Sequence, residues 1–126
     1  MKSIEHSEQV ALMQWWAFTS KLFGVTEQLL FAIPNGGQRN LIVAKKLKAE
    51  GVRAGVPDLF LAVKRGGFGG LFIEMKKPKG GRVSDNQKEC ISLLKEQGYL
   101  AVVCNGWLEA KGQIEHYLSI KETNNE

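Results

Sequence analysis

The segments Pro57-Asp58-Leu59-Phe60-Leu61 and Leu71-Phe72-Ile73-Glu74-Met75-Lys76 decide the fold of this chain. Both are short apolar runs bounded by charged residues, which is typical of strands that are largely buried. The stretch between them, residues 64–70, contains four glycines and suits a hairpin connection. We therefore predict two paired strands, over residues 58–63 and 71–76.

Charged side chains stand at the ends of these strands. Alternation places Glu74 and Lys76 on one face and Met75 on the other, and Asp58 opens the partner strand, so its carboxylate can lie near Glu74. Two carboxylates and a backbone carbonyl form an oxygen site that suits Mg²⁺, and the Lys76 ammonium could orient an activated water toward a phosphodiester. The alternative is an ordinary surface ion pair. However, unpaired charges at buried strand ends cost several kcal/mol.

Local signals place the other elements around these strands. On the first helix, apolar spacing predicts a stripe at Val10, Met13, Trp16, Ala17 and Ser20. The order αβαββαβα predicts an α/β fold, with one mixed sheet and helices packed on its faces. We expect a single domain over residues 1–120 and a polar tail over residues 121–126. Four helices are predicted: one that begins at Ser3 or Ser7, one over residues 40–50, one from Ser84 to Gly98 and one over residues 108–119. Two further strands are predicted over residues 29–33 and 99–104.

Basic residues are concentrated in the middle of the chain. Residues 39–88 hold twelve Lys and Arg against four Asp and Glu, a balance of +8, and the rest hold five against nine, a balance of −4. This asymmetry indicates a face for a polyanion such as nucleic acid, or equally a solvated basic surface. The lysines within residues 45–48 fit a solvated helix face better. Candidate DNA contacts are Asn35, Arg39, Arg53, Lys77, Lys79 and Arg82.

The composition excludes several classes of protein. With 44% hydrophobic and 24% charged residues, the chain is neither disordered nor of low complexity. No apolar run approaches the roughly 18 residues of a membrane span, and the N-terminus lacks the apolar core of a signal peptide. We therefore expect a cytoplasmic or otherwise intracellular protein that is not secreted and has no membrane partner. Cys90 and Cys104 are too few for a zinc framework and are expected to be reduced thiols.

Taken together, these motifs resemble a known family. Residues 51–61 (GVRAGVPDLFL), residues 73–78 (IEMKKP) and the later Gln87 resemble the VRR-NUC branch of the PD-(D/E)xK nucleases, the virus-type replication and repair nucleases. The turn at residues 33–37 (IPNGG) and the order of helices add to the resemblance. It extends from Glu8 to the final helix and implies a restriction-endonuclease-like fold.

The resemblance also implies a metal-dependent deoxyribonuclease. It assigns metal ligation to Asp58, Glu74 and the Met75 carbonyl, and makes Lys76 the catalytic lysine. The expected cofactor is Mg²⁺, with Mn²⁺ able to substitute. The small stand-alone members of the family resemble Holliday-junction resolvases and act as homodimers, so branched DNA is the expected substrate and a homodimer the expected form.

Two further residues of the predicted site have alternative roles. The first-helix acid of the family best matches Glu8, as a metal ligand and catalytic residue, and Glu5 is close enough in the sequence to be confused with it. Either could be an ordinary acid in the first helical turn. Gln87 fits a capping box with Ser84, whereas the resemblance places it beside the metal-bound water or phosphate, which we take as the prediction.

Rival functions remain open at this level. One is a catalytically silent DNA-binding module of the same fold, against which the intact Asp58, Glu74 and Lys76 argue. Another is a nuclease for flaps or other non-junction DNA. A candidate dimer contact is Phe68, at the centre of the glycine-rich hairpin, if this side chain does not fold back onto its own sheet.

Overall fold

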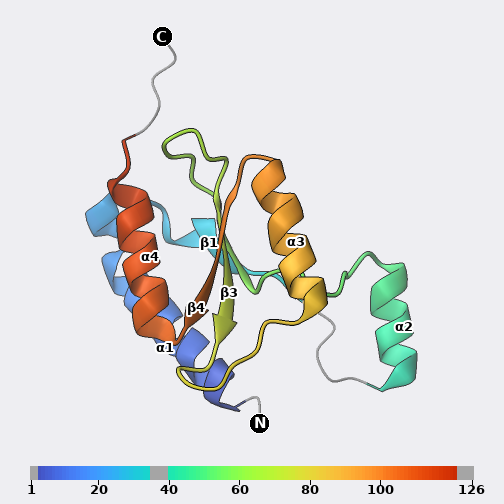
Figure 1. Cartoon of the computed structure of the whole chain (residues 1–126). Helices are drawn as coiled ribbons and strands as arrows, with labels where there is room; N and C mark the ends of the chain where they lie inside the picture. Colours follow the sequence, from blue (N-terminus) through green and yellow to red (C-terminus); the bar gives the residue numbers. More distant parts are fainter. Residues whose placement is uncertain (1–2, 35–39, 122–126) are drawn as a thin grey trace.

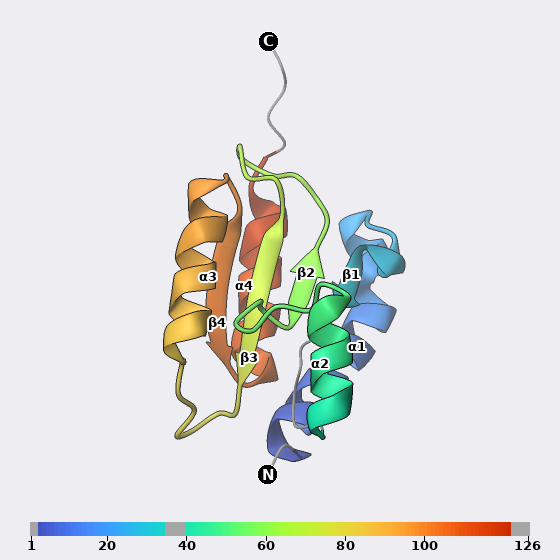
Figure 2. The same cartoon turned by 90° about the vertical axis from the view of Figure 1, so that its right-hand side faces the viewer.

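The fold is an α/β arrangement in which a four-stranded sheet lies between helices. The structure is a computed structural model that describes residues 3–34 and 40–121. One face of the sheet is covered by two helices and the other by one, while a fourth helix stands off on that second side (Figures 1 and 2). The covering pair is α1 (Ser3–Thr19) and α4 (Trp107–Ser119), the single helix is α3 (Asp85–Glu96), and the separate one is α2 (Leu41–Ala49).

The sheet has the mixed topology that was predicted. The strands lie in the order β1-β2-β3-β4, with β1, β2 and β3 antiparallel and β4 parallel to β3. The parallel pair needs a crossover, which α3 provides. The predicted αβαββαβα order is confirmed, with two 3₁₀ turns added between α1 and β1. The strands are β1 (Leu30–Ala32), β2 (Leu59–Leu61), β3 (Leu71–Lys76) and β4 (Leu100–Asn105).

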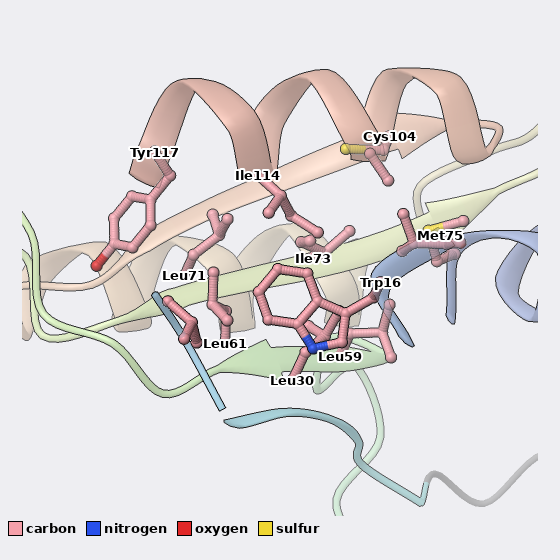
Figure 3. Packing of buried hydrophobic residues seen from close by; sticks show 13 residues of the cluster. Trp16, Leu30, Leu59, Leu61, Leu71, Ile73, Met75, Cys104, Ile114 and Tyr117 are labelled. Atoms are coloured by element: carbon pink, nitrogen blue, oxygen red, sulfur yellow. The ribbon is translucent and has the colours of Figure 1, made fainter. Parts of the chain in front are cut away.

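The hydrophobic core lies between the sheet and the layer formed by α1 and α4 (Figure 3). Leu59, Ile73 and Trp16 are fully buried there. Burial of such side chains contributes about 1.5–3 kcal/mol each. The Tyr117 hydroxyl donates a hydrogen bond of 2.6 Å to the Val63 carbonyl, so the polar end of this buried ring is satisfied. In the described part of the chain, no helix combines the length and apolar character needed to cross a membrane.

The buried stripe of α1 differs in part from the prediction. Trp16 and Ser20 are buried as expected, and Leu12 joins them, but Val10 is 40% exposed and Ala17 is also exposed. The middle of this helix is apolar at so many positions that spacing alone admits more than one stripe. Packing of α1 against α4 and β3 selects the stripe with spacing of four residues, which includes Leu12 and Trp16 and continues to Ser20 in the 3₁₀ turn after the helix.

The hairpin between β2 and β3 folds back onto the core. Arg65 and Phe68 form an isolated antiparallel bridge, and the Phe68 side chain is partly buried against core residues. The centroid of its ring lies 6.3 Å from that of Tyr117. Of the two placements weighed for Phe68, the structure shows the one in which the side chain folds back onto its own chain, where it is partly buried.

Candidate active site

Strands β2 and β3 bring Asp58, Glu74 and Lys76 together at one end of the sheet. The pairing of Leu59 with Ile73 places Asp58, which precedes β2, beside the last residues of β3. There Asp58 Oδ2 accepts a hydrogen bond of 2.7 Å from the Met75 amide. Alternation turns Glu74 and Lys76 to the opposite face from the buried Met75, and Lys76 Nζ lies 3.4 Å from Glu74 Oε2. The geometry thus places the predicted side chains in one site.

The two carboxyl groups are held in surroundings that oppose their ionisation. Glu74 is only 3% exposed, and burial, followed by the charge of Asp58, raises the pKa of Glu74 to about 8. The neighbouring Lys76 ammonium acts in the opposite direction. Burial also raises the pKa of Asp58, against the hydrogen bond from the Met75 amide. In the protein alone, both shifts therefore favour retention of a proton on this pair.

Gln87 links the amino end of α3 to the active site. Its Oε1 accepts a hydrogen bond of 2.9 Å from the Ser84 amide, and Ser84 Oγ accepts one of 3.1 Å from the Gln87 amide, which completes a capping box. Its Nε2 donates at 2.9 Å to Glu74 Oε2. Opposite ends of one side-chain amide thus form the capping box and contact Glu74, so the capping role does not remove Gln87 from the site. The role of Gln87 beside the metal-bound water or phosphate stays a prediction.

The two acids of the first helix have different surroundings. Glu8 Oε1 accepts a hydrogen bond of 2.7 Å from the Trp107 amide, at the amino end of α4 where the N-cap residue Gly106 has no side chain. Glu8 thus caps α4 across the tertiary structure. Burial is the main cause of the raised pKa of Asp58, and the charge of Glu5 adds to it. The catalytic and metal-binding role assigned to Glu8 stays a prediction, and Glu5 is the first-helix acid whose charge acts on Asp58.

A glycine after β3 allows the chain to close over the lysine. Lys76 is 8% exposed although its side chain is charged. A Cβ atom added at Gly81 would lie 2.8 Å from Lys76 Cβ, closer than real side chains approach. Only glycine therefore lets the loop between β3 and α3 pack on the stem of Lys76.

The oxygen atoms of the site fit a divalent cation. Glu74 Oε1 is buried and has no hydrogen-bond partner in the described part of the protein. In a strand, the carbonyl of a residue points to the same side as its amide, so the Met75 carbonyl faces the side of Asp58. Within residues 3–34 and 40–121, no cluster of three or more His, Cys, Asp and Glu side chains could hold a metal. A cation here would therefore rest on two carboxylates, one carbonyl and water, a donor set suited to Mg²⁺ or Mn²⁺.

The predicted DNA contacts that the structure describes lie on two loops. One loop joins α2 to β2 and leads directly to Asp58, and the other leads from Lys76 to α3. Both loops therefore adjoin the site. They carry Arg53 on the first and Lys77, Lys79 and Arg82 on the second, all exposed except the half-buried Lys77. The remaining predicted contacts, Asn35 and Arg39, lie outside the described residues.

Comparison with known proteins finds a matching family and a similar solved structure. The sequence matches the VRR-NUC domain family over residues 2–107. A solved structure described as a VRR_NUC domain protein is 30% identical, with a TM-score of 0.82 over 96% of this chain and 93% of that chain. No protein of curated function matches the sequence. The matched region contains both strands of the site, and the chain therefore belongs to the VRR-NUC family of nuclease domains.

Proposed function

We propose that this protein is a metal-dependent, structure-selective DNA endonuclease that hydrolyses phosphodiester bonds. The observation that carries the proposal is the buried Glu74 beside Lys76 and the half-buried Asp58, in which Glu74 Oε1 has no hydrogen-bond partner among the described residues. A buried carboxylate oxygen left without a donor is costly unless a cation or proton occupies it. Membership of a nuclease family supports the reaction class.

In this proposal, each side chain has a separate task. Asp58, Glu74 and the Met75 carbonyl would hold Mg²⁺ or Mn²⁺, which when bound supplies an acidified water and offsets phosphate charge. Lys76 Nζ, at 3.4 Å from Glu74 Oε2, would orient the attacking water and stabilise charge that develops on the phosphate. Gln87 holds the Glu74 carboxylate in place through its 2.9 Å hydrogen bond.

The proton on the carboxyl pair links this activity to pH. Because burial and the Asp58 charge raise the pKa of Glu74 to about 8, the carboxyl must release a proton before it can hold a cation. We therefore expect apparent metal affinity to rise with pH toward this value. Isothermal titration in buffers of different ionisation enthalpy would detect the released proton.

Branched DNA is the proposed substrate and a homodimer the proposed form. One site attacks one phosphodiester at a time, and a four-way junction has approximate two-fold symmetry. An isologous dimer would present two identical sites to opposite strands. Light scattering at micromolar concentration should then give about twice the chain mass of 14.0 kDa. A monomer that cuts junctions by unpaired nicks would contradict the dimer and leave the nuclease proposal standing.

The decisive experiment compares cleavage of a four-way junction, a flap, a splayed arm and a linear duplex, with Mg²⁺ and with Mn²⁺. Asp58→Asn should lose both cation binding and cleavage. Lys76→Ala should still bind the cation but cut at least about a hundredfold more slowly. Lys111→Ala, on α4 and therefore on the other side of the sheet, is the control and should cut normally. Normal cleavage by a folded Lys76→Ala protein would exclude the mechanism, and binding without cleavage by the wild type would favour the silent module.

The role of the first-helix acid needs its own comparison. Glu5→Gln and Glu8→Gln each remove one negative charge and keep an oxygen acceptor. The variant that loses cleavage without losing thermal stability identifies the acid that acts at the site. If Glu8 serves α4 alone, its variant should show reduced stability and retain cleavage, because its carboxylate binds the Trp107 amide.

A further inference from the structure

Helix α2 stands apart from the rest of the molecule although it is well formed. The Asn40 side chain caps it by accepting a hydrogen bond of 2.8 Å from the Val43 amide, yet none of its residues is buried. Leu41 and Ile42 are 69% and 80% exposed. A helix of nine residues is marginally stable in water without tertiary contacts. These exposed apolar side chains therefore indicate a surface that a partner covers.

The position of α2 places this surface on the side of the sheet that carries the active site. Figures 1 and 2 show α2 and α3 on the same side, opposite α1 and α4. The Glu74 side chain faces that side, since it accepts a hydrogen bond from Gln87 of α3. The loop that follows α2 also packs closely against α3. Gly55, with φ of +89°, lies so close to the Asn86 backbone that any Cβ atom there would collide with the Asn86 carbonyl.

The charge of α2 favours DNA as the partner. The helix carries three exposed lysines and no acidic residue. Two copies of such a helix packed together would bring like charges into contact, whereas a phosphate backbone supplies the complementary charge. The lysines are Lys45, Lys46 and Lys48.

The arrangement of side chains along α2 suits two kinds of contact with DNA. Helical spacing aligns Leu41 with Lys45 and Lys48, and Ile42 with Lys46, so each exposed stripe begins with an aliphatic side chain and continues with lysine. Lysines bind phosphates without regard to sequence. Aliphatic side chains on a DNA-binding surface can pack against base faces where the stack is interrupted. A branch point interrupts the stack, and a linear duplex does not.

We propose that α2 is a DNA-binding arm that contacts branched DNA beside the cleavage site. Its lysines contact phosphates, and Leu41 and Ile42 pack against base faces at the branch point. This inference rests on the proposed function and adds the surface that distinguishes a branched from a linear substrate.

The test measures DNA affinity without cleavage. Fluorescence anisotropy in EDTA would compare a four-way junction with a linear duplex for the variant Leu41→Ser/Ile42→Ser. The junction should bind about tenfold more weakly and the duplex should change less than about twofold. The control variant is Phe18→Ser/Leu22→Ser, and it should bind as the wild type does. These side chains are 85% and 82% exposed and lie at the carboxyl end of α1 and in the 3₁₀ turn that follows it. An unchanged junction affinity in the α2 variant would overturn the proposal.

Two further measurements test the phosphate contacts and the rival partner, which is a second copy of this chain. Replacement of Lys45, Lys46 and Lys48 by glutamine should flatten the slope of log affinity against log salt by roughly two to three on both DNAs, at unchanged helix content by circular dichroism. An unchanged slope would overturn the phosphate contacts. If Leu41→Ser/Ile42→Ser instead converts a dimer into a monomer in light scattering, a second copy covers α2 and the proposal is wrong. If all of these variants cut DNA at the wild-type rate and with the wild-type preference for junctions over duplex, only the proposed role of α2 is refuted. If the wild type itself neither binds nor cuts DNA, the proposed function is refuted.

Discussion

Replacement of Glu74 by glutamine should stabilise the metal-free protein by an amount that depends on pH. Glu74 is 3% exposed, and burial, followed by the charge of Asp58, raises its pKa from 4.5 to about 8. In the unfolded chain the same carboxyl is in water and has its ordinary pKa. Between these two values the folded protein holds a proton on Glu74 that the unfolded chain has released.

The sign and size of the effect follow from this difference in bound protons. Where the folded state binds more protons, the free energy of unfolding falls as pH rises, by about 1.4 kcal/mol per pH unit for one group. The decline begins near pH 4.5 and ends near pH 8. Glu74 therefore costs the folded protein about 3 kcal/mol at pH 7 and on the order of 5 kcal/mol above pH 8. Glutamine does not titrate, so the variant escapes this cost.

The assay is urea unfolding in EDTA at each pH unit from 5 to 9. The difference in unfolding free energy between Glu74→Gln and wild type should widen with pH and then level off above about pH 8. Glu115→Gln, at an exposed acid on α4, is the matched control and should follow the wild type. Saturating Mg²⁺ should stabilise the wild type more than the variant. Parallel curves for Glu74→Gln and wild type in EDTA would refute the reasoning, because they would mean that Glu74 titrates normally in the folded state.

Other predictions follow from contacts around the site. Gln87→Ala should lower stability by about 1 kcal/mol through the lost capping box and should also slow cleavage. Ser84→Ala should lower stability by a similar amount but change cleavage little. Chemical denaturation and single-turnover kinetics would measure these effects, and equal effects of the two variants on the cleavage rate would deny Gln87 a role at the site. Gly81→Ala should slow cleavage about tenfold or more by displacing the stem of Lys76. The control is Gly112→Ala in α4, where the added Cβ would meet nothing within 4 Å beyond its own turn of helix. This variant should cut normally and melt at a higher temperature, because alanine favours a helix by roughly 0.5–1 kcal/mol. If the Gly81 and Gly112 variants cut alike, the prediction for Gly81 is wrong.

The sequence by itself determined the elements and the composition of the site. Alternation placed Glu74 and Lys76 on one face of a strand because the direction of successive side chains in a strand is a property of the backbone. The Ser84 and Gln87 spacing marked the start of α3 because a capping box closes within one helical turn. Such local patterns are decided over a few residues. For the same reason, the order of elements and the resemblance to the VRR-NUC family are evident in the amino-acid sequence alone.

The tertiary structure decided which surfaces meet and which stay free. Phe68 turned inward and Glu8 bound the amino end of α4, because each found its partner in a segment distant in the sequence. The raised pKa of Glu74 also required the packed molecule, since burial and the nearby Asp58 arise only when β2 and β3 pair. Helix α2 is the opposite case: its apolar spacing resembles that of a packed helix, yet the folded chain leaves Leu41 and Ile42 exposed. The spacing of apolar residues indicates that a helix has an apolar face, and only the packing of the whole chain determines what covers that face.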